Sequence, residues 1–136
     1  LVMCYEGKLL IASPYVRSGS FAQTVVLVLK HGDEGATGLV LNAPVETGRP
    51  DVVLILESIL GEAGRAVRQA YIGGPIANTF TMIHADPKYA KATILPDVYL
   101  TDDPVSMGHV IRHDFFKCRC FVGYAGWASG QLEYEM

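Results

Sequence analysis

The sequence lacks a strong charge of either sign. Of its 136 residues, 18% are charged, and the formal net charge is −3 with a pI near 5.7. Dedicated nucleic-acid binders carry a basic excess that attracts phosphate, so this composition disfavours nucleic acid as a partner. A disordered chain is excluded as well, because 50% of the residues are hydrophobic and the net charge is small. The composition therefore predicts a globular protein with a substantial apolar core.

Cysteine is scarce, and long apolar runs and export signals are missing. The cysteines are Cys4, Cys118 and Cys120, an odd number that predicts a reduced protein of the cytoplasm when no secretory leader is seen. No apolar stretch reaches the roughly 18 residues that cross a membrane, which predicts no membrane partner. The length predicts one domain over residues 1–136, and we expect the C-terminal part of that domain to lie beyond Met136.

Short apolar runs separated by turn residues make up most of the chain. Residues 24–30, with the sequence TVVLVLK, predict a buried strand, and residues 36–42 predict its hairpin partner across a loop at 31–35. Further strands are predicted at residues 7–12, 70–72, 79–84, 93–95, 98–100 and 117–124. Because strands outnumber helices and short loops join most neighbours, the pattern predicts an α+β fold with a largely antiparallel sheet.

Helices are predicted where capping residues precede apolar positions. Asp51 caps a predicted helix over residues 52–60 that Gly61 ends, although this run is apolar enough to form a strand instead. Asp103 followed by Pro104 predicts the start of a second helix, which ends near position 113. These two helices complete the α+β pattern.

The stretch GYAGWASGQLE, residues 123–133, combines three glycines with the only tryptophan of the chain, Trp127. Glycine reaches backbone angles that other residues avoid. We therefore expect the last strand to end in a sharp turn here and the chain to restart as a helix near Gln131. Trp127 is expected to anchor this turn by packing, and stacking on a base or a partner side chain is the alternative.

Several motifs occur together in one order along the chain. They are GKLLIASP at residues 7–14, Phe21 with TVVL at 24–27, His31, GATGLVLN at 35–42, Pro44, GGP at 73–75, Phe80, His84, VYLT at 98–101, and GYAGW with QLE at 123–133. This ordered set, above all GYAGW followed by GQLE, resembles the AlgH/YqgE family of bacterial and plastid proteins. The resemblance covers residues 7–135.

The resemblance implies a branched, partly barrel-like sheet flanked by helices. It also implies a regulatory role, since some members carry the label of transcriptional regulator. No catalytic activity, substrate or cofactor comes with the family, so we expect no cofactor.

Polar residues at strand ends and turns are the candidates for function: His31, Asn42, His84 and Gln131. A histidine beside a carboxylate such as Glu133 can act as a general base, because imidazole titrates near neutral pH. The alternative is that these side chains tie loops down by hydrogen bonds to backbone groups. No nucleophile motif or triad spacing accompanies them, which favours the structural role.

His109 and His113 share one face of the predicted helix, and Cys118 and Cys120 share one face of the last predicted strand. Together they are weak candidates for a two-histidine, two-cysteine zinc site. A C-x-C pair within a strand chelates zinc poorly, and both cysteines fit apolar core positions, so we predict no metal. A single solvent-facing cysteine beside a basic neighbour suits a redox-sensing thiol instead.

The sequence thus predicts a non-enzymatic cytoplasmic regulatory protein that binds a protein partner. Its candidate functional surface comprises His31, Asn42, His84, Trp127, Gln131 and Glu133, and residues 126–133 are the preferred contact region. The alternative is a small-molecule- or metal-dependent enzyme that uses His31, His84 and Glu133 in a cleft.

Overall fold

The computed structural model describes residues 4–13, 22–45, 50–65, 70–114 and 117–135. The motif residues Pro14 and Phe21 lie outside these ranges. Residue contacts group into two compact units. The first, here called the hairpin unit, comprises Leu1–Ala43, Ile72–Thr79 and Val122–Met136. The second, the helical unit, comprises Pro44–Tyr71 and Phe80–Phe121. The expectation of one domain over residues 1–136 stays a prediction.

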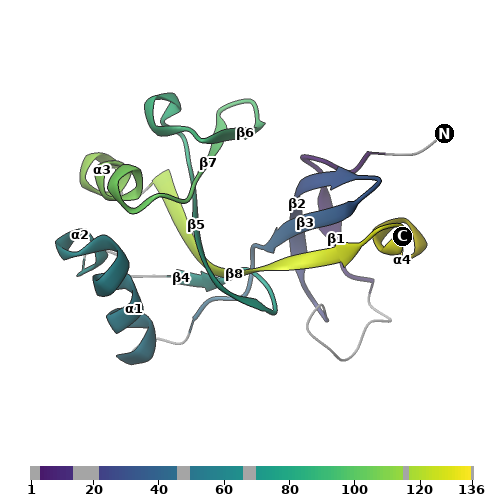
Figure 1. Ribbon diagram of the computed structural model, residues 1–136, viewed down its shortest axis with the longest axis horizontal. Helices are drawn as coiled ribbons and strands as arrows, with labels where there is room; N and C mark the ends of the chain where they lie inside the picture. Colours follow the sequence, from purple (N-terminus) through teal and green to yellow (C-terminus); the bar gives the residue numbers. More distant parts are fainter. Residues whose placement is uncertain (1–3, 14–21, 46–49, 66–69, 115–116, 136) are drawn as a thin grey trace. The chain divides into compact units, whose positions relative to one another are not determined.

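The hairpin unit is built on antiparallel strands (Figure 1). Its elements are β1 (Leu9–Ile11), β2 (Val25–Gly32), β3 (Gly35–Val40), the C-terminal part of β8 (Cys118–Ala128) and α4 (Gln131–Glu135). β3 pairs with both β2 and β8. The predicted hairpin is confirmed, and its loop is shorter than predicted because Gly32 and Gly35 already pair across it.

One buried cluster joins β2, β3, β8 and α4 in this unit. Its members are Val26, Ala36, Val40, Ala125, Trp127 and Leu132. Ala125 and Trp127 alternate along β8 with the half-buried Tyr124 and Gly126, so one face of the strand enters the core. A buried aromatic ring contributes the largest apolar area to such a cluster. The indole of Trp127 is therefore the main anchor of the hairpin unit.

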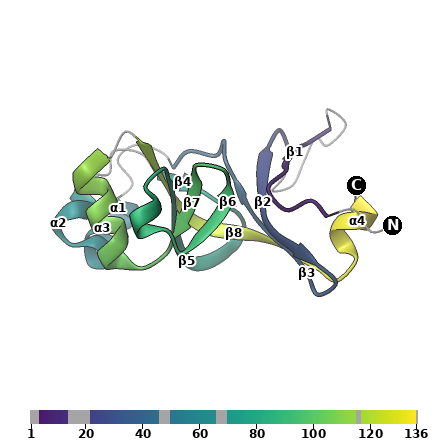
Figure 2. The same ribbon diagram turned by 90° about the horizontal axis from the view of Figure 1, so that it is seen from above.

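The helical unit contains the longer helices and the remaining strands (Figure 2). Its elements are α1 (Pro50–Leu60), α2 (Glu62–Arg65), η1 (Pro87–Tyr89), β6 (Ala92–Leu95), β7 (Val98–Thr101) and α3 (Pro104–Asp114). Met82, Met107 and Phe121 are fully buried here and form part of its core. The predicted cap of α3 is observed, because the Asp103 carboxylate accepts a hydrogen bond of 2.9 Å from the Ser106 N–H.

β8 is the branch point of the sheet. β4 (Ala70–Ile72), β5 (Ile76–His84) and β8 each contribute residues to both units. Among the described residues the strands follow the order β1-β2-β3-β8-β5-β7-β6, and β4 also pairs with β8. The pairs β1–β2, β2–β3, β3–β8, β5–β7 and β6–β7 are all antiparallel. The predicted α+β class with a branched, largely antiparallel sheet is confirmed.

The predicted end of the last strand at residue 124 is wrong, whereas the predicted glycine turn and the restart of the chain as a helix at Gln131 are confirmed. β8 continues through Gly123 and Gly126 as far as Ala128, and the turn comes only at Ser129 and Gly130. Gly123 has a φ of +78°, and a Cβ placed there would lie 2.7 Å from the Gly74 carbonyl oxygen. Gly123 therefore allows neighbouring backbone to approach the strand, and at Gly126 an added Cβ would lie 2.8 Å from the Ile76 side chain. Both glycines permit close approach instead of ending the strand.

Candidate functional site

His31 and Glu133 lie together in the hairpin unit. The His31 side chain is only 2% exposed, at the hairpin end of β2. Its Nδ1 accepts a hydrogen bond of 2.9 Å from the Tyr5 N–H, and its Nε2 contacts Glu133 Oε1 on α4. The Tyr5 ring packs against the imidazole with 5.4 Å between ring centroids. His31 thus joins the N-terminal segment, β2 and α4.

Both ring nitrogens of His31 are occupied in this arrangement. Because Nδ1 accepts from a backbone N–H, it carries no proton, so the neutral ring carries its proton on Nε2 and donates it to Glu133. A general base needs a free lone pair directed at a substrate proton. His31 has no such free lone pair here, and its contacts instead connect the N-terminal segment, β2 and α4.

Asn42 and Gln131 also hold backbone groups. The Asn42 side chain accepts a hydrogen bond of 2.9 Å from the Val25 N–H and donates one of 2.9 Å to the Gln23 carbonyl, so it fastens the start of β2. Gln131 Oε1 accepts a hydrogen bond of 2.9 Å from the Ala128 N–H and thereby closes the turn before α4. His31 and Asn42 thus serve opposite ends of the hairpin.

Trp127 packs inward in the hairpin unit. The residue is 8% exposed, and its Nε1–H donates a hydrogen bond of 3.0 Å to Glu135 Oε2. The ring lies against Gly38, where a Cβ would come within 3.3 Å of Trp127 Cζ3. A buried ring cannot stack on a base or a partner side chain without leaving this core. Its position matches the packing role and not the stacking alternative.

His84 lies in the helical unit, whereas His31 lies in the hairpin unit. His84 ends β5, is 3% exposed, and accepts a hydrogen bond of 3.1 Å at Nδ1 from the Asp86 N–H. Its Nε2 is buried without a hydrogen-bond partner among the described residues. Burial lowers the pKa of His84, and the nearby Asp86 carboxylate opposes this shift only in part. The neutral imidazole is therefore the form that folding favours.

The lowered pKa of His84 makes stability depend on pH. The unfolded imidazole titrates near 6.5, and the folded one lower, so the unfolded chain binds more protons between the two values. We expect the contribution of His84 to the free energy of unfolding to be at its maximum above pH 6.5. It should decrease as the pH drops below 6.5 and become constant below the pKa of the folded state. Urea unfolding at a series of pH values measures this dependence.

His84→Asn is the matched variant for this measurement. The asparagine oxygen can still accept from the Asp86 N–H, but the side chain does not titrate. In this variant the free energy of unfolding should therefore decrease less below pH 6.5, because the contribution of His84 protonation is absent. Identical pH dependence in the two proteins would show that folding does not alter protonation of this imidazole.

The four zinc candidates do not converge on a metal site. His109 stacks on the Tyr89 ring, with centroids 5.2 Å apart and an interplanar angle of 11°. Cys118 is partly exposed and Cys120 is buried. In the described ranges no group of three or more His, Cys, Asp or Glu side chains is placed to hold a metal ion. The described geometry thus supplies too few ligands for zinc.

A cavity of about 240 Å³ lies in the helical unit. It is lined by Ala85, Asp86, Pro87, Val110, His113 and Lys117. The Asp86 carboxylate is already engaged, because its Oδ1 accepts a hydrogen bond of 3.0 Å from the Lys88 N–H at the start of η1. A ligand site needs several convergent polar groups to fix orientation. The wall also carries the polar side chains of His113 and Lys117, and this mixed set of groups does not define a ligand class.

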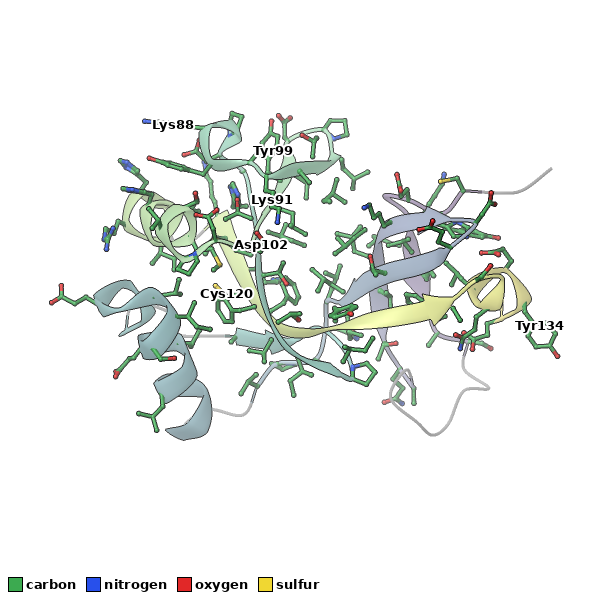
Figure 3. All side chains as sticks on the ribbon, in the orientation of Figure 1. Lys88, Lys91, Tyr99, Asp102, Cys120 and Tyr134 are labelled. Carbon is green, nitrogen blue, oxygen red and sulfur yellow. The ribbon has the colours of Figure 1, made fainter. Side chains whose placement is uncertain are left out.

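Tyr134, which is 91% exposed on α4, is not among the residues that the sequence patterns single out. Figure 3 shows its ring pointing away from the helix. The remaining exposed residues of this region are Ala128, Ser129, Gly130, Gln131, Glu133 and Glu135; with Tyr134 they form what we call the α4 surface. The sequence does hold a signal for it. Leu132 is buried, and a helical residue two positions further on points to the opposite side.

A family model described as AlgH-like (DUF179) matches residues 9–136. A UPF0301 protein of Cytophaga hutchinsonii is 33% identical over 141 residues, covering 98% of this chain and 74% of that protein. A UPF0301 protein of Chlamydia muridarum is 35% identical over 136 residues, covering 96% of this chain and 69% of that protein. None of these names states a biochemical activity. Across the described residues, no helix combines the length and apolarity needed to span a membrane.

Two solved structures are similar to this one. The solution structure of the AlgH protein from Pseudomonas aeruginosa has a TM-score of 0.70 and 27% identity, covering 94% of this chain and 70% of that one. A crystal structure of a Corynebacterium diphtheriae protein has a TM-score of 0.67 and 22% identity, covering 95% of this chain and 69% of that one, and shows the fold alone. Sequence and fold thus agree, and the chain belongs to the AlgH-like family.

Proposed function

We propose that this chain is a non-enzymatic regulatory protein of the cytoplasm that binds a protein partner through the α4 surface. The observation that carries the proposal is Tyr134, an aromatic side chain 91% exposed on a firmly held helical turn. Aromatic residues are enriched in protein interfaces, where they supply large apolar area at little cost in conformational entropy. The His31–Glu133 pair argues against catalysis in this unit, because both imidazole nitrogens are engaged.

The α4 surface is rigid where it meets the rest of the hairpin unit. Glu133 contacts His31, Glu135 accepts from Trp127, and Ser129 donates from its hydroxyl to the Asp33 carbonyl. A surface already fixed by internal hydrogen bonds loses little conformational freedom when a partner binds. This favours a docking surface over a loop that must fold on contact.

The charges on and beside this surface are mostly acidic. Glu133 and Glu135 lie on it, Asp33 accepts a hydrogen bond from Ser129, and Glu6 accepts one from the His31 N–H beside Glu133. Negative potential attracts a basic contact segment and repels phosphate. We therefore propose a protein partner with a basic segment, and any effect on transcription would act through that protein rather than through direct contact with DNA.

Site-specific photocrosslinking tests this proposal. A benzophenone amino acid replaces Tyr134 in one sample and Val105 in the other, because Val105 is 71% exposed on α3 of the helical unit. We expect one protein to be crosslinked reproducibly from position 134 and not from position 105. The yield should fall as ionic strength rises, since screening weakens exposed charge pairs.

The crosslinked protein must then be purified and its affinity measured. Tyr134→Ala should weaken binding by about tenfold or more, as expected for an aromatic residue at the centre of an interface. Equal adducts from both positions, or an affinity that Tyr134→Ala does not change, would contradict the α4 surface as the contact region.

A further inference from the structure

Two thiols in the helical unit lie side by side on one strand. Cys118 and Cys120 both belong to β8 and are two residues apart, so their side chains leave the same face of the strand. Cys120, which is labelled in Figure 3, is 2% exposed, whereas Cys118 at the start of the strand is partly exposed. The pair therefore combines one partly exposed residue with one buried residue.

The two thiols interact with each other. A hydrogen bond to Cys118, together with burial, raises the pKa of the Cys120 thiol far above its ordinary value, so Cys120 keeps its proton. A proton held on Cys120 is available for donation to Cys118 Sγ. A donated hydrogen bond stabilises a thiolate, which is the nucleophilic form of cysteine. Cys118 is thus the thiol favoured to react.

We propose that Cys118 and Cys120 form a redox-active pair that exchanges with low-molecular-weight disulfides. In the first step the Cys118 thiolate attacks a disulfide RSSR, forms a Cys118–S–S–R bond and releases RS⁻. In the second step Cys120 transfers its proton to solvent, attacks Cys118 Sγ and expels the second RS⁻. The net change oxidises two protein thiols to one disulfide and reduces RSSR to two thiols. This chemistry is separate from the α4 surface.

Strand geometry makes the resulting disulfide easy to reduce. Residues two apart in an extended strand have Cα atoms about 6.6 Å apart, from a rise of about 3.3 Å per residue. Unstrained disulfides span Cα distances of up to about 6.8 Å, most often below 6 Å. Both Cβ atoms leave the same face, so in the extended strand they are also about 6.6 Å apart, beyond the roughly 3.5–4.5 Å that a disulfide spans. The bond therefore forms only when the start of β8 leaves the extended conformation. Strained disulfides are the labile ones, which suits a reversible reaction.

The experiment treats the full chain with oxidised glutathione, followed by intact-mass measurement and peptide mapping without reductant. Cys4→Ser is the working background, because Cys4 is an exposed thiol outside the pair. In the unaltered chain Cys4 serves as the control that the oxidant is active. We expect the Cys4→Ser protein to lose two hydrogen atoms by linking Cys118 to Cys120, and dithiothreitol to reverse this change.

Single replacements of each thiol separate the two steps. With Cys120→Ser added, the reaction should stop at glutathione attached to Cys118. With Cys118→Ser added instead, Cys120 should stay unmodified. A pair that stays reduced while Cys4 reacts overturns the proposal, and so does glutathione that remains on Cys118 when Cys120 is present, or equal modification of the two single variants.

Alkylation rates give a second readout that folding defects do not imitate. Cys120→Ala removes the hydrogen-bond donor, whereas Cys120→Ser keeps one. Iodoacetamide should alkylate Cys118 about tenfold more slowly in the alanine variant than in the serine variant near neutral pH, because less thiolate is present. Equal rates in two variants that melt at the same temperature would rule out Cys120 as the group that activates Cys118.

Discussion

Replacing Trp127 with alanine is expected to lower the free energy of unfolding by about 3–5 kcal/mol, the range for removing a large buried aromatic side chain. The indole is 8% exposed and lies in the cluster that joins β2, β3, β8 and α4. Its removal leaves a cavity that Gly38, the residue beneath the ring, cannot fill. The hydrogen bond from Nε1 to Glu135 is lost as well.

Urea unfolding followed by far-ultraviolet circular dichroism measures this loss. Trp127→Phe keeps a ring in the core but removes the N–H donor, so it should cost about 1–2 kcal/mol, less than the alanine variant. Tyr134→Ala is the exposed control and should change stability by less than about 0.5 kcal/mol. A Trp127→Ala protein as stable as this control would mean that the tryptophan is not the anchor of the hairpin unit.

The Trp127 result also decides how partner binding can be tested. A variant that loses several kcal/mol of stability can lose its partner simply by unfolding. Tyr134→Ala removes an aromatic side chain from the surface without touching the core. It is therefore the sharper probe of the α4 surface, although the sequence draws attention to Trp127 first.

Elements set by local patterns can be predicted from this sequence. β2 and β3 follow from β-branched runs on either side of a short polar turn, and α3 follows from an Asp cap with proline at the first helical position. α1 is a helix although its apolar run also fits a strand, and it ends at Gly61, which has a φ of +60°. Such signals depend only on residues close in sequence.

Contacts between distant segments cannot be predicted in the same way. His31 and Glu133 are 102 positions apart, and only the pairing of β3 with β8 brings their elements together. The third group in this arrangement is the backbone N–H of Tyr5. Every residue except proline has such a group, so the residue type does not reveal the contact. The sequence suggests a histidine beside Glu133, but the hydrogen bond that occupies Nδ1 is visible only in the structure.

The glycines of β8 show a second limit of sequence reasoning. A glycine permits a turn, a left-handed residue or a close approach of another backbone, and the residue type does not distinguish these uses. Gly123 and Gly126 predict a turn, yet both lie inside a continuous strand. What selects close approach is the neighbouring segment at Gly74 and Ile76, which is remote in sequence.

Replacing Gly123 with alanine is accordingly expected to cost about 3 kcal/mol or more in the free energy of unfolding. Gly123 has a φ of +78°, a conformation that is strained for a residue with a Cβ. The added Cβ would lie 2.7 Å from the Gly74 carbonyl oxygen and 2.9 Å from that of Ile76. Both contacts are with backbone atoms, so no side-chain rotation relieves them.

Two other glycines separate conformational strain from the steric clash. Gly61 has a φ of +60° with no atom within 4 Å of an added Cβ, and Gly61→Ala should cost about 1 kcal/mol. Gly32 also has nothing within 4 Å and has no positive φ, so Gly32→Ala should stay within about 0.5 kcal/mol of the parent. Urea unfolding of the three variants gives the order. If Gly123→Ala costs no more than Gly61→Ala, the strand has room to shift, and close backbone approach is not what requires glycine in β8.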